Sequence, residues 1–338
     1  MKVVTVGEIM LRLAPLGYYR FVQADQFGVE YGGGEANVAV FLANFGANSV
    51  YVTKLPDHEI GQSAVNSLRR YGVNTDYIVR GGDRIGIYFL EKGASQRASK
   101  VIYDRKGSAF AESSFEEYQW DEILKDADWL HLTGITPALG GKTADLSLRL
   151  CEEAKRRNIV VSCDLNYRKK LWTKEEARNV MLKLMNFVDV CIANEEDANN
   201  IFGICAENTD VISGDLDKNG YVSVARQLRE KFGFKKVAIT LRSSISASDN
   251  VWGALLYDGD PHFSTEYKVH IVDRVGGGDS FAAALIYSLL RGDTSQEAVE
   301  YAAAASCLKH SIEGDCNLVS DSEVRTLAKG DASGRVSR

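Results

Sequence analysis

The sequence predicts an α/β fold in which helices cover both faces of a mostly parallel sheet and a second, smaller sheet stands apart. Short buried strand patterns alternate with amphipathic helix patterns, and two longer stretches are strand-rich without a helix pattern. Such alternation favours right-handed βαβ units. A chain of 338 residues is long enough for one large domain with an appendage, or for two modest domains.

The expected core elements follow one another along the chain. Apolar runs that suit strands buried on both faces occur at 3–6, 48–54, 129–133, 160–164, 188–193 and 236–241. Apolar residues at helical spacing occur at 36–45, 61–71, 143–157, 174–184 and 223–232. Together these segments predict three layers, with the sheet between two layers of helices.

Two stretches, about 11–31 and 84–110, break the alternation. They are rich in Tyr, Phe, Val and Gly, a composition typical of strands joined by turns. We expect them to form a small sheet that stands off the main domain as a lid. The domain then spans residues 1–327, and we expect 328–338 to be a disordered tail because it has almost nothing to bury.

Charge and composition exclude several partners. The net charge is −6, and no stripe of Lys and Arg interleaved with aromatic residues is present, so we expect no nucleic-acid partner. The N-terminus carries Glu8 and lacks the pattern of a signal peptide. No apolar run approaches the ~20 residues that span a bilayer. We expect a cytoplasmic protein that binds no membrane.

Three glycines open a predicted helix in the segment 273–281, DRVGGGDSF, which continues as AAALIYSLL. Glycine lets successive backbone N–H groups point toward one position, and a helix N-terminus adds partial positive charge. Gly276, Gly277 and Gly278 therefore predict an anion hole for a phosphoryl group.

Asp279 follows these glycines and has two interpretations. Asp is a favoured N-cap, because its oxygen accepts hydrogen bonds from the first amides of a helix. A cap needs none of the three glycines, whereas a phosphate site does, so we prefer a catalytic role. A carboxylate beside an anion hole can accept the proton of an attacking hydroxyl during phosphoryl transfer.

Two motifs resemble the signatures of one family, the PfkB (ribokinase-like) carbohydrate kinases. The run GGGEANVA at 32–39 is similar to the N-terminal signature, and 273–281 is similar to the C-terminal signature D-x-x-G-[AG]-G-D-[ST]-F. The resemblance covers the chain to about residue 327. It implies a ribokinase-like αβα three-layer fold with a β-sheet lid that closes over the sugar, and a homo-oligomer formed through that lid.

Within the family, the chain most resembles kinases that act on 2-keto-3-deoxygluconate. The resemblance rests on 33–37, Tyr88, the run YDRKGSA from Tyr103, the run HLTGITPAL, and DLNYR at 164–168 followed by Leu171 and Trp172. It implies transfer of the γ-phosphate of ATP to a small-molecule sugar acid, with Mg²⁺ bridging the phosphates. It leaves a requirement for a monovalent cation open.

The resemblance also implies site residues. Arg105 and Arg168 can offer forked donors to a carboxylate or to phosphates, or they can form surface salt bridges. Tyr88 and Tyr103 can contact the sugar or pack in the lid. The expected substrate-side residues are Gly33, Gly34, Glu35, Ala36, Asn37, Tyr88, Tyr103, Arg105, Arg168, Asp279 and Asp315.

For the nucleotide, the resemblance implies Asn166, Arg168, Asn194, the loop 241–247 with Leu241, Arg242, Ser243 and Ala247, and Gly276 and Gly278. The N-x-x-E motif of the family reads Asn-Glu-Glu-Asp at 194–197. We expect Asp197, helped by Glu196, to hold a magnesium-bound water. Asp197 is one methylene shorter than the Glu of the family motif.

Other functions fit parts of the sequence. The acceptor could be a neutral sugar such as fructose or ribose, for which Arg105 would be less necessary. The chain could also be a non-catalytic sugar- or nucleotide-binding regulator, although Asp279 and the three glycines argue against this. A flavin or nicotinamide enzyme is the least supported, because Gly7 lacks the companion glycines of a dinucleotide fingerprint.

Overall fold

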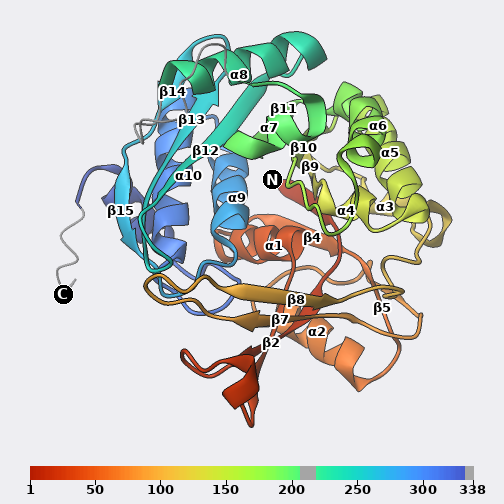
Figure 1. The fold of residues 1–338 in the computed structure, drawn as a ribbon. Helices are drawn as coiled ribbons and strands as arrows, with labels where there is room; N and C mark the ends of the chain where they lie inside the picture. Colours follow the sequence, from red (N-terminus) through yellow and green to blue (C-terminus); the bar gives the residue numbers. More distant parts are fainter. Residues whose placement is uncertain (206–217, 332–338) are drawn as a thin grey trace.

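The computed structural model describes residues 1–205 and 218–331, where a sheet of nine strands forms the centre (Figure 1). Its order is β14-β13-β12-β11-β10-β9-β1-β4, and β15 pairs with β13. Six strands run parallel: β12 (Lys236–Ser244), β11 (Val190–Asn194), β10 (Val160–Asp164), β9 (Trp129–Thr133), β1 (Lys2–Val6) and β4 (Asn48–Val52). Three antiparallel strands complete one edge: β13 (Asp249–Tyr257), β14 (Pro261–Phe263) and β15 (Tyr267–His270).

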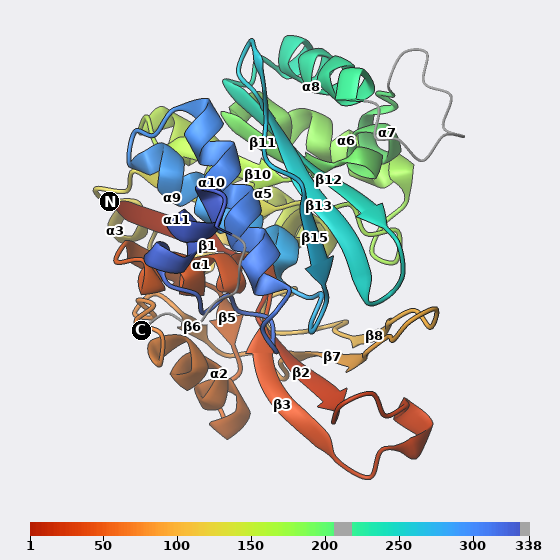
Figure 2. The ribbon, with the colours of Figure 1, turned by 90° about the vertical axis from the view of Figure 1, so that its left-hand side faces the viewer.

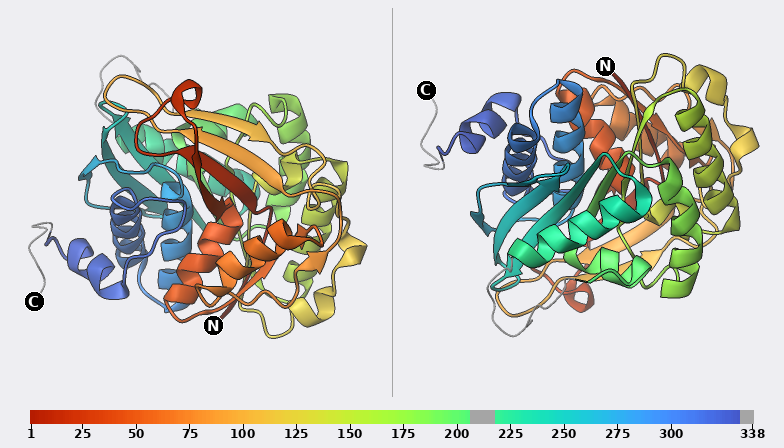
Figure 3. Two further views of the ribbon diagram at one scale, coloured as in Figure 1. Left: turned by 90° about the horizontal axis from the view of Figure 1, so that it is seen from below. Right: turned by 90° about the horizontal axis from the view of Figure 1, so that it is seen from above.

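Helices cover both faces of this sheet (Figure 3). Successive strand residues point to opposite faces, so Val4 and Val6 of β1 join one apolar layer and Val3 joins the other. One layer includes α5 (Gly141–Arg156), α6 (Lys174–Leu184), α7 (Glu195–Phe202) and α8 (Lys218–Phe232). The other includes α1 (Gly34–Asn44), α9 (Gly277–Leu290), α10 (Ser295–Lys309) and α11 (Asp321–Ala328). The prediction of three layers around a mostly parallel sheet is confirmed.

A second sheet stands off the main body, as Figure 2 shows. Its order is β3-β2-β7-β8, formed by β3 (Phe27–Gly32), β2 (Met10–Pro15), β7 (Gly86–Glu91) and β8 (Lys100–Asp104). We call these four strands the lid. Met10, Tyr88 and Leu90 form a small apolar cluster on it, and Val275 of the Gly-rich turn packs against that cluster. The lid therefore touches the turn that was expected to carry the chemistry.

Some elements differ from the sequence expectations. β4 ends at Val52, and a separate strand β5 (Lys54–Leu55) pairs with β6 (Val79–Arg80). A 3-10 turn, η1 (Phe21–Gln23), lies between the first two lid strands. The expected tail lies outside the described residues from 332 onward. The remaining helical elements are α2 (Glu59–Arg69), η2 (Phe115–Glu117), α3 (Trp120–Ile123), α4 (Ile135–Ala138) and η3 (Met185–Phe187).

The described part of the chain has no helix with the length and apolar character that crossing a membrane requires.

Candidate active site

A cavity of about 860 Å³ opens where the parallel strands end, between the sheet and the lid. Asp164 and Asn194, the last residues of β10 and β11, border it, and so do Met10 and Tyr103 of the lid. In sheets of this kind ligands bind beyond the carboxyl ends of the strands. The volume is within the range of about 300–1,000 Å³ that is usual for small-molecule sites.

The Gly-rich turn forms one wall of this cavity. Gly276 is the N-cap of α9 and has φ 82°, a left-handed conformation that favours glycine. A Cβ on Gly277 would lie 2.6 Å from the ring of His310, whereas a Cβ on Gly278 would meet nothing within 4 Å. Because the first N–H groups of a helix lack partners within it, this turn presents backbone donors beside open space.

Asp279 is the third residue of α9, and the N-cap position belongs to Gly276. Oδ2 of Asp279 accepts a hydrogen bond of 2.7 Å from Nδ2 of Asn37, near the start of α1. Burial raises the pKa of Asp279 to about 6; the Asn37 bond opposes this rise, Asp315 and Glu35 add to it, and Arg168 lowers the pKa. The carboxyl group is therefore ionised at neutral pH yet binds a proton more readily than an ordinary Asp.

The first glycine motif lets α1 approach the strand ends. A Cβ on Gly33 would lie 2.1 Å from the carbonyl oxygen of Glu8, and one on Gly34 would lie 3.5 Å from Oδ1 of Asp279. Glu35 borders the cavity, but its Oε1 accepts hydrogen bonds from the backbone and hydroxyl of Thr133, both 2.9 Å, and from Thr136 at 2.8 Å. Glu35 thus ties α1 to the end of β9.

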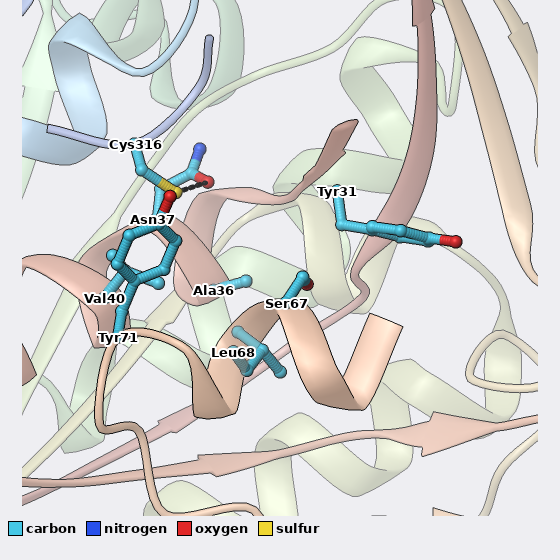
Figure 4. A pocket seen from close by; sticks show the side chains of 8 residues that line it. All are labelled: Tyr31, Ala36, Asn37, Val40, Ser67, Leu68, Tyr71 and Cys316. Carbon is cyan, nitrogen blue, oxygen red and sulfur yellow. Dashed lines mark hydrogen bonds between the residues drawn. The ribbon is translucent and has the colours of Figure 1, made fainter. Parts of the chain in front are cut away.

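Behind Asn37 lies a small second cavity of about 20 Å³ (Figure 4). Ala36 lines this small cavity and is absent from the wall of the large one, so the structure does not bring it to the substrate side as expected. The Cys316 thiol lies 3.8 Å from Oδ1 of Asn37, the contact dashed in Figure 4. This thiol supports the orientation in which the amide nitrogen of Asn37 faces Asp279.

The lid brings three expected residues to the large cavity. Tyr88 and Tyr103 are paired across β7 and β8, with ring centroids 6.2 Å apart. Tyr88 is buried and donates its hydroxyl hydrogen bond to Asp315, whereas Tyr103 is exposed. Nε of Arg105 donates to Oε2 of Glu8 over 2.7 Å, and Nη2 of Arg105 bonds the same oxygen. The surface salt bridge considered for Arg105 is instead a buried ion pair at the cavity wall.

A buried ion-pair network joins the lid to the Gly-rich turn, and the sequence analysis missed its centre, Arg12. Nη2 of Arg12 contacts Asp273 and Nη1 contacts Asp315, each over 2.5 Å. Burial opposes the charge on Arg12, but Asp315 and Asp273 outweigh it and raise the pKa of the guanidinium. The sequence did contain a signal for Arg12. It is a charged residue in the apolar run IMLRLAP, at a position where the alternation of strand side chains points inward.

The strand ends also position polar groups opposite the lid. Asn166 has φ 39°, which Asn tolerates better than most residues, and its backbone N–H donates to Asp164 over 3.2 Å. Asn194 caps α7 by accepting from the backbone N–H groups of Glu196 and Asp197. Seven basic side chains border the cavity or its rim: Arg105, Arg168, Lys169, Lys170, Lys174, Arg242 and Arg274.

The expected nucleotide loop 241–247 needs correction. Residues 241–244 belong to β12, which pairs with β13 as far as Ser244 and Asn250. Leu241 is buried in the apolar layer, and Leu241, Ser243 and Ala247 are absent from the cavity wall. The backbone N–H of Ala247 instead donates to the carbonyl of Ser95 between two lid strands. Of these four residues, the structure brings only Arg242 to the cavity.

Asp197 also borders the cavity, but its oxygens already accept backbone hydrogen bonds. Oδ2 accepts from the N–H of Asn194 over 3.2 Å, and Oδ1 accepts from the N–H of Tyr167 over 3.1 Å.

Burial, with the nearby charges of Asp197 and Asp279, raises the pKa of Asp164 well above its ordinary value. Asp164 is a second site residue that the sequence analysis did not single out. Within 1–205 and 218–331 no three His, Cys, Asp or Glu side chains form a ready metal cluster.

The geometry can now be set beside known proteins. The model of the pfkB family carbohydrate kinases matches residues 1–321. The chain belongs to this family. The family prediction from the two Gly-rich motifs is therefore confirmed, and both motifs border the cavity, with Asn37 of the first bonded to Asp279 of the second.

Several pfkB relatives resemble the chain over nearly its whole length. A crystal structure of 2-dehydro-3-deoxygluconokinase from Thermotoga maritima is 52% identical, with a TM-score of 0.94, and the match covers 98% of this chain and 100% of that one. A 2-dehydro-3-deoxygalactonokinase from Haloferax volcanii is 33% identical over 334 residues, 98% of each chain. A 2-dehydro-3-deoxygluconokinase from Thermoproteus tenax is 28% identical, covering 93% of this chain and 90% of its own.

Proposed function

We propose that the chain phosphorylates 2-keto-3-deoxygluconate with ATP, giving 2-keto-3-deoxy-6-phosphogluconate. The observation that carries the proposal is the carboxylate of Asp279, held by Asn37 beside the glycine-lined start of α9. The acceptor follows from the relatives, since the 52% identical Thermotoga maritima protein is named for this substrate. The names 2-dehydro-3-deoxygluconate and 2-keto-3-deoxygluconate denote the same compound.

In the proposed reaction Asp279 accepts the proton of the primary hydroxyl as that oxygen attacks the γ-phosphorus of ATP. The new bond joins the sugar oxygen to phosphorus, and the bond to the β–γ bridging oxygen breaks, which leaves ADP. A base with a pKa of about 6 is ionised at pH 7 and still has useful proton affinity. Phosphoryl transfer depends mainly on positioning and charge stabilisation. One general base and a cavity wall with many hydrogen-bond donors are therefore sufficient for this reaction.

The amides of the turn 276–279 would stabilise charge on the transferring group. Arg168 borders the same cavity as Asp279, and its charge lowers the pKa of that carboxyl, so it would act on the same phosphoryl group. Lys169, Lys170, Lys174, Arg242 and Arg274 would bind the other phosphates as charged donors. Lid closure over the sugar would exclude water, which otherwise competes with the sugar hydroxyl.

Magnesium fits this site as an ion that arrives with the nucleotide. Mg²⁺ prefers oxygen ligands and keeps several waters, so phosphates and one or two carboxylates can complete its shell. Asp164, Glu196 and Asp197 border the cavity as oxygen donors that could hold such waters. The bound ion would neutralise charge on the phosphates. Burial raises the pKa of Asp164, and the charges of Asp197 and Asp279 add to this rise; a cation nearby would oppose it.

A sugar acid also needs a positive partner for its carboxylate. Arg105 remains our candidate, since it lies on the cavity wall beside Tyr103, with its guanidinium carbon 5.6 Å from the ring centroid. Its ion pair with Glu8 fixes the side chain before substrate binds. A fixed guanidinium loses little conformational freedom when it pairs with a carboxylate.

The acceptor is tested by ADP release from Mg-ATP with 2-keto-3-deoxygluconate, its galactonate epimer, fructose and ribose. The wild type should prefer a sugar acid, and Arg105→Ala should raise KM for the acid by about 10–100-fold, as loss of a charged hydrogen bond implies. Arg149→Ala is the control, because Arg149 forms exposed ion pairs outside the cavity wall. If a neutral sugar is the best substrate, the sugar-acid part of the proposal is wrong. If no acceptor is phosphorylated, the proposed kinase activity is wrong.

The lid also supports a homo-oligomer. Exposed apolar side chains gather on it and on its connecting turn: Leu16, Tyr18, Tyr19, Val22, Phe27, Val29 and Ile102. A second copy of the chain would cover such a surface. Light scattering should give a mass near twice the 37.2 kDa of the chain, and Val22→Asp with Val29→Asp should return it to the monomer. A wild-type monomer at micromolar concentration would contradict this part.

A further inference from the structure

Lys309 is a buried cation for which the proposed reaction has so far given no role. It is the last residue of α10 and is 0% exposed. Its Nζ lies 3.2 Å from the carbonyl oxygen of Ile312 and 3.5 Å from that of Asp273. Asp273 begins the Gly-rich motif, and Ile312 precedes the segment that ends at Asp315. One ammonium group therefore links the two segments that meet at the anion hole.

Those two segments are also in close contact with each other. A Cβ on Gly276 would lie 1.9 Å from the carbonyl oxygen of Asp315 and 3.3 Å from Cε of Lys309. The stem of Lys309 thus lies directly beside the N-cap residue of α9. A change in the distance between the two segments would move the first amides of α9, which face the phosphoryl group in the proposed reaction.

Charge balance indicates that this lysine is protonated. Burial lowers the pKa of Lys309 below its ordinary value; Asp273 and Asp315 oppose this lowering, and Arg12 adds to it. The buried side chains around the turn comprise two carboxylates, Asp273 and Asp315, and two bases, Arg12 and Lys309. Buried charge is costly unless it is compensated, and the set is neutral only when both bases carry their protons.

We propose that Lys309 is a built-in cation that positions the anion hole, so that phosphoryl transfer by this chain requires no added monovalent cation. A single positive charge among backbone carbonyls is the environment that K⁺ or NH₄⁺ would occupy, and here the ammonium is covalently attached. The inference rests on the proposed kinase function. It makes Lys309 a positioning residue, since it acts through the turn 276–279 and not on the substrate.

The first test uses the wild type, with ATP, sugar acid and buffer supplied as tetramethylammonium or Tris salts. The kcat should stay within about twofold when 100 mM KCl, NaCl or NH₄Cl replaces tetramethylammonium chloride. Activation by K⁺ of more than tenfold would overturn the inference while leaving the kinase assignment intact. Absence of turnover in every salt would instead contradict the proposed function itself, so the two failures are distinguishable.

The second test removes the ammonium group with Lys309→Ala. The carbonyl oxygens that it contacted should then be able to bind an added cation. In tetramethylammonium salts its kcat should fall about 10–100-fold, and KCl or NH₄Cl should restore at least a tenth of wild-type kcat. Its melting temperature should also rise in KCl relative to tetramethylammonium chloride, a readout that needs no substrate. Crystals soaked in rubidium chloride should show anomalous density between the carbonyls of residues 273 and 312.

Lys236→Ala is the matched control. Lys236 is a partly buried lysine at the first position of β12, where it contacts Asp258 and Ser295. It should show no K⁺-dependent gain in kcat or melting temperature. If Lys309→Ala is folded and fully active in tetramethylammonium salts, Lys309 does not position the site. If Lys309→Ala does not fold, Lys309→Met replaces it, because Met keeps an apolar stem without the charge. A Lys309→Met variant with the kcat of the wild type would also overturn the inference.

Discussion

The amide of Asn37 donates a hydrogen bond of 2.7 Å to the carboxylate of Asp279, although 242 positions separate the two residues in sequence. This bond joins the two Gly-rich motifs at one point of the cavity. It also opposes the burial that raises the pKa of Asp279, because it stabilises the ionised form. A residue of the first motif therefore reduces the proton affinity of the proposed base in the second motif.

Removing this hydrogen bond should move the pH dependence of the reaction. In the wild type, kcat/KM should rise with pH through an apparent pKa of about 6 and then level off, because the base acts when deprotonated. Asn37→Ala should move this rising limb of the pH profile to higher pH, and it should lower kcat/KM at pH 7. Asn66→Ala, on the exposed face of α2, should leave the limb in place. An unshifted limb in Asn37→Ala would show that the bond does not tune Asp279.

Asp279 should also make the folded protein less stable at neutral pH. Its pKa is raised from 3.8 to about 6, so the folded state holds the proton more tightly and stability falls as pH rises between these values. Asp279→Asn should therefore increase the free energy of unfolding at pH 8 by an amount on the order of 1–3 kcal/mol, with little difference at pH 4. Denaturant melts at the two pH values measure this. Equal stability of the two proteins at pH 8 would contradict the raised pKa.

Arg12 should be essential for stability because it neutralises two buried carboxylates. Arg12→Met leaves Asp273 and Asp315 without their partner, and loss of one member of a buried ion pair costs about 3–5 kcal/mol. Arg84→Met is the control at the lid, because Arg84 pairs with the exposed Asp104 and its loss should cost about 1 kcal/mol or less. Urea unfolding gives both values. Similar losses for the two variants would mean that the Arg12 network contributes no more than a surface pair.

The two glycines at the start of α9 should respond differently to alanine. A Cβ at Gly277 meets the His310 ring at 2.6 Å, so Gly277→Ala should lower the melting temperature, and the added change His310→Ala should recover part of the loss. A Cβ at Gly278 meets no neighbour, so Gly278→Ala should fold normally but lower kcat by about tenfold or more by entering the phosphoryl space. A fully active Gly278→Ala would place the phosphoryl group elsewhere.

The alternation of buried strands and amphipathic helices predicted the main sheet because each pattern is local. The runs at 129–133 and 160–164 became β9 and β10 without change, since both faces of these strands are almost entirely buried. The end of β12 was missed because a strand pairing with β13 to Ser244 depends on a partner that local pattern does not reveal. The polar, exposed character of that segment resembles a loop.

Site residues within the two motifs could be predicted because glycine, Asp and Asn carry their chemistry with short, defined spacing. Arg12 and Glu8 could not, and neither could the role of Asp273 at the start of the second motif, because these roles depend on ion pairs across more than 90 residues of sequence. Ala36 lies in the first motif yet turns toward the small cavity behind Asn37, because successive helical residues face different directions. A motif thus marks a place in the fold, while the orientation of each side chain depends on the packing around it.

The central claim is that Asp279 is the base for transfer of phosphate to a sugar acid, and single-turnover ADP release with 2-keto-3-deoxygluconate tests it most directly. Asp279→Asn keeps the size of the side chain and can still contact Asn37, but it accepts no proton, so kcat should fall about 10²–10⁴-fold while ATP binding is retained. Calorimetric ATP titration and melting curves confirm that the variant is intact. A folded, ATP-binding Asp279→Asn with kcat within tenfold of the wild type would contradict the account.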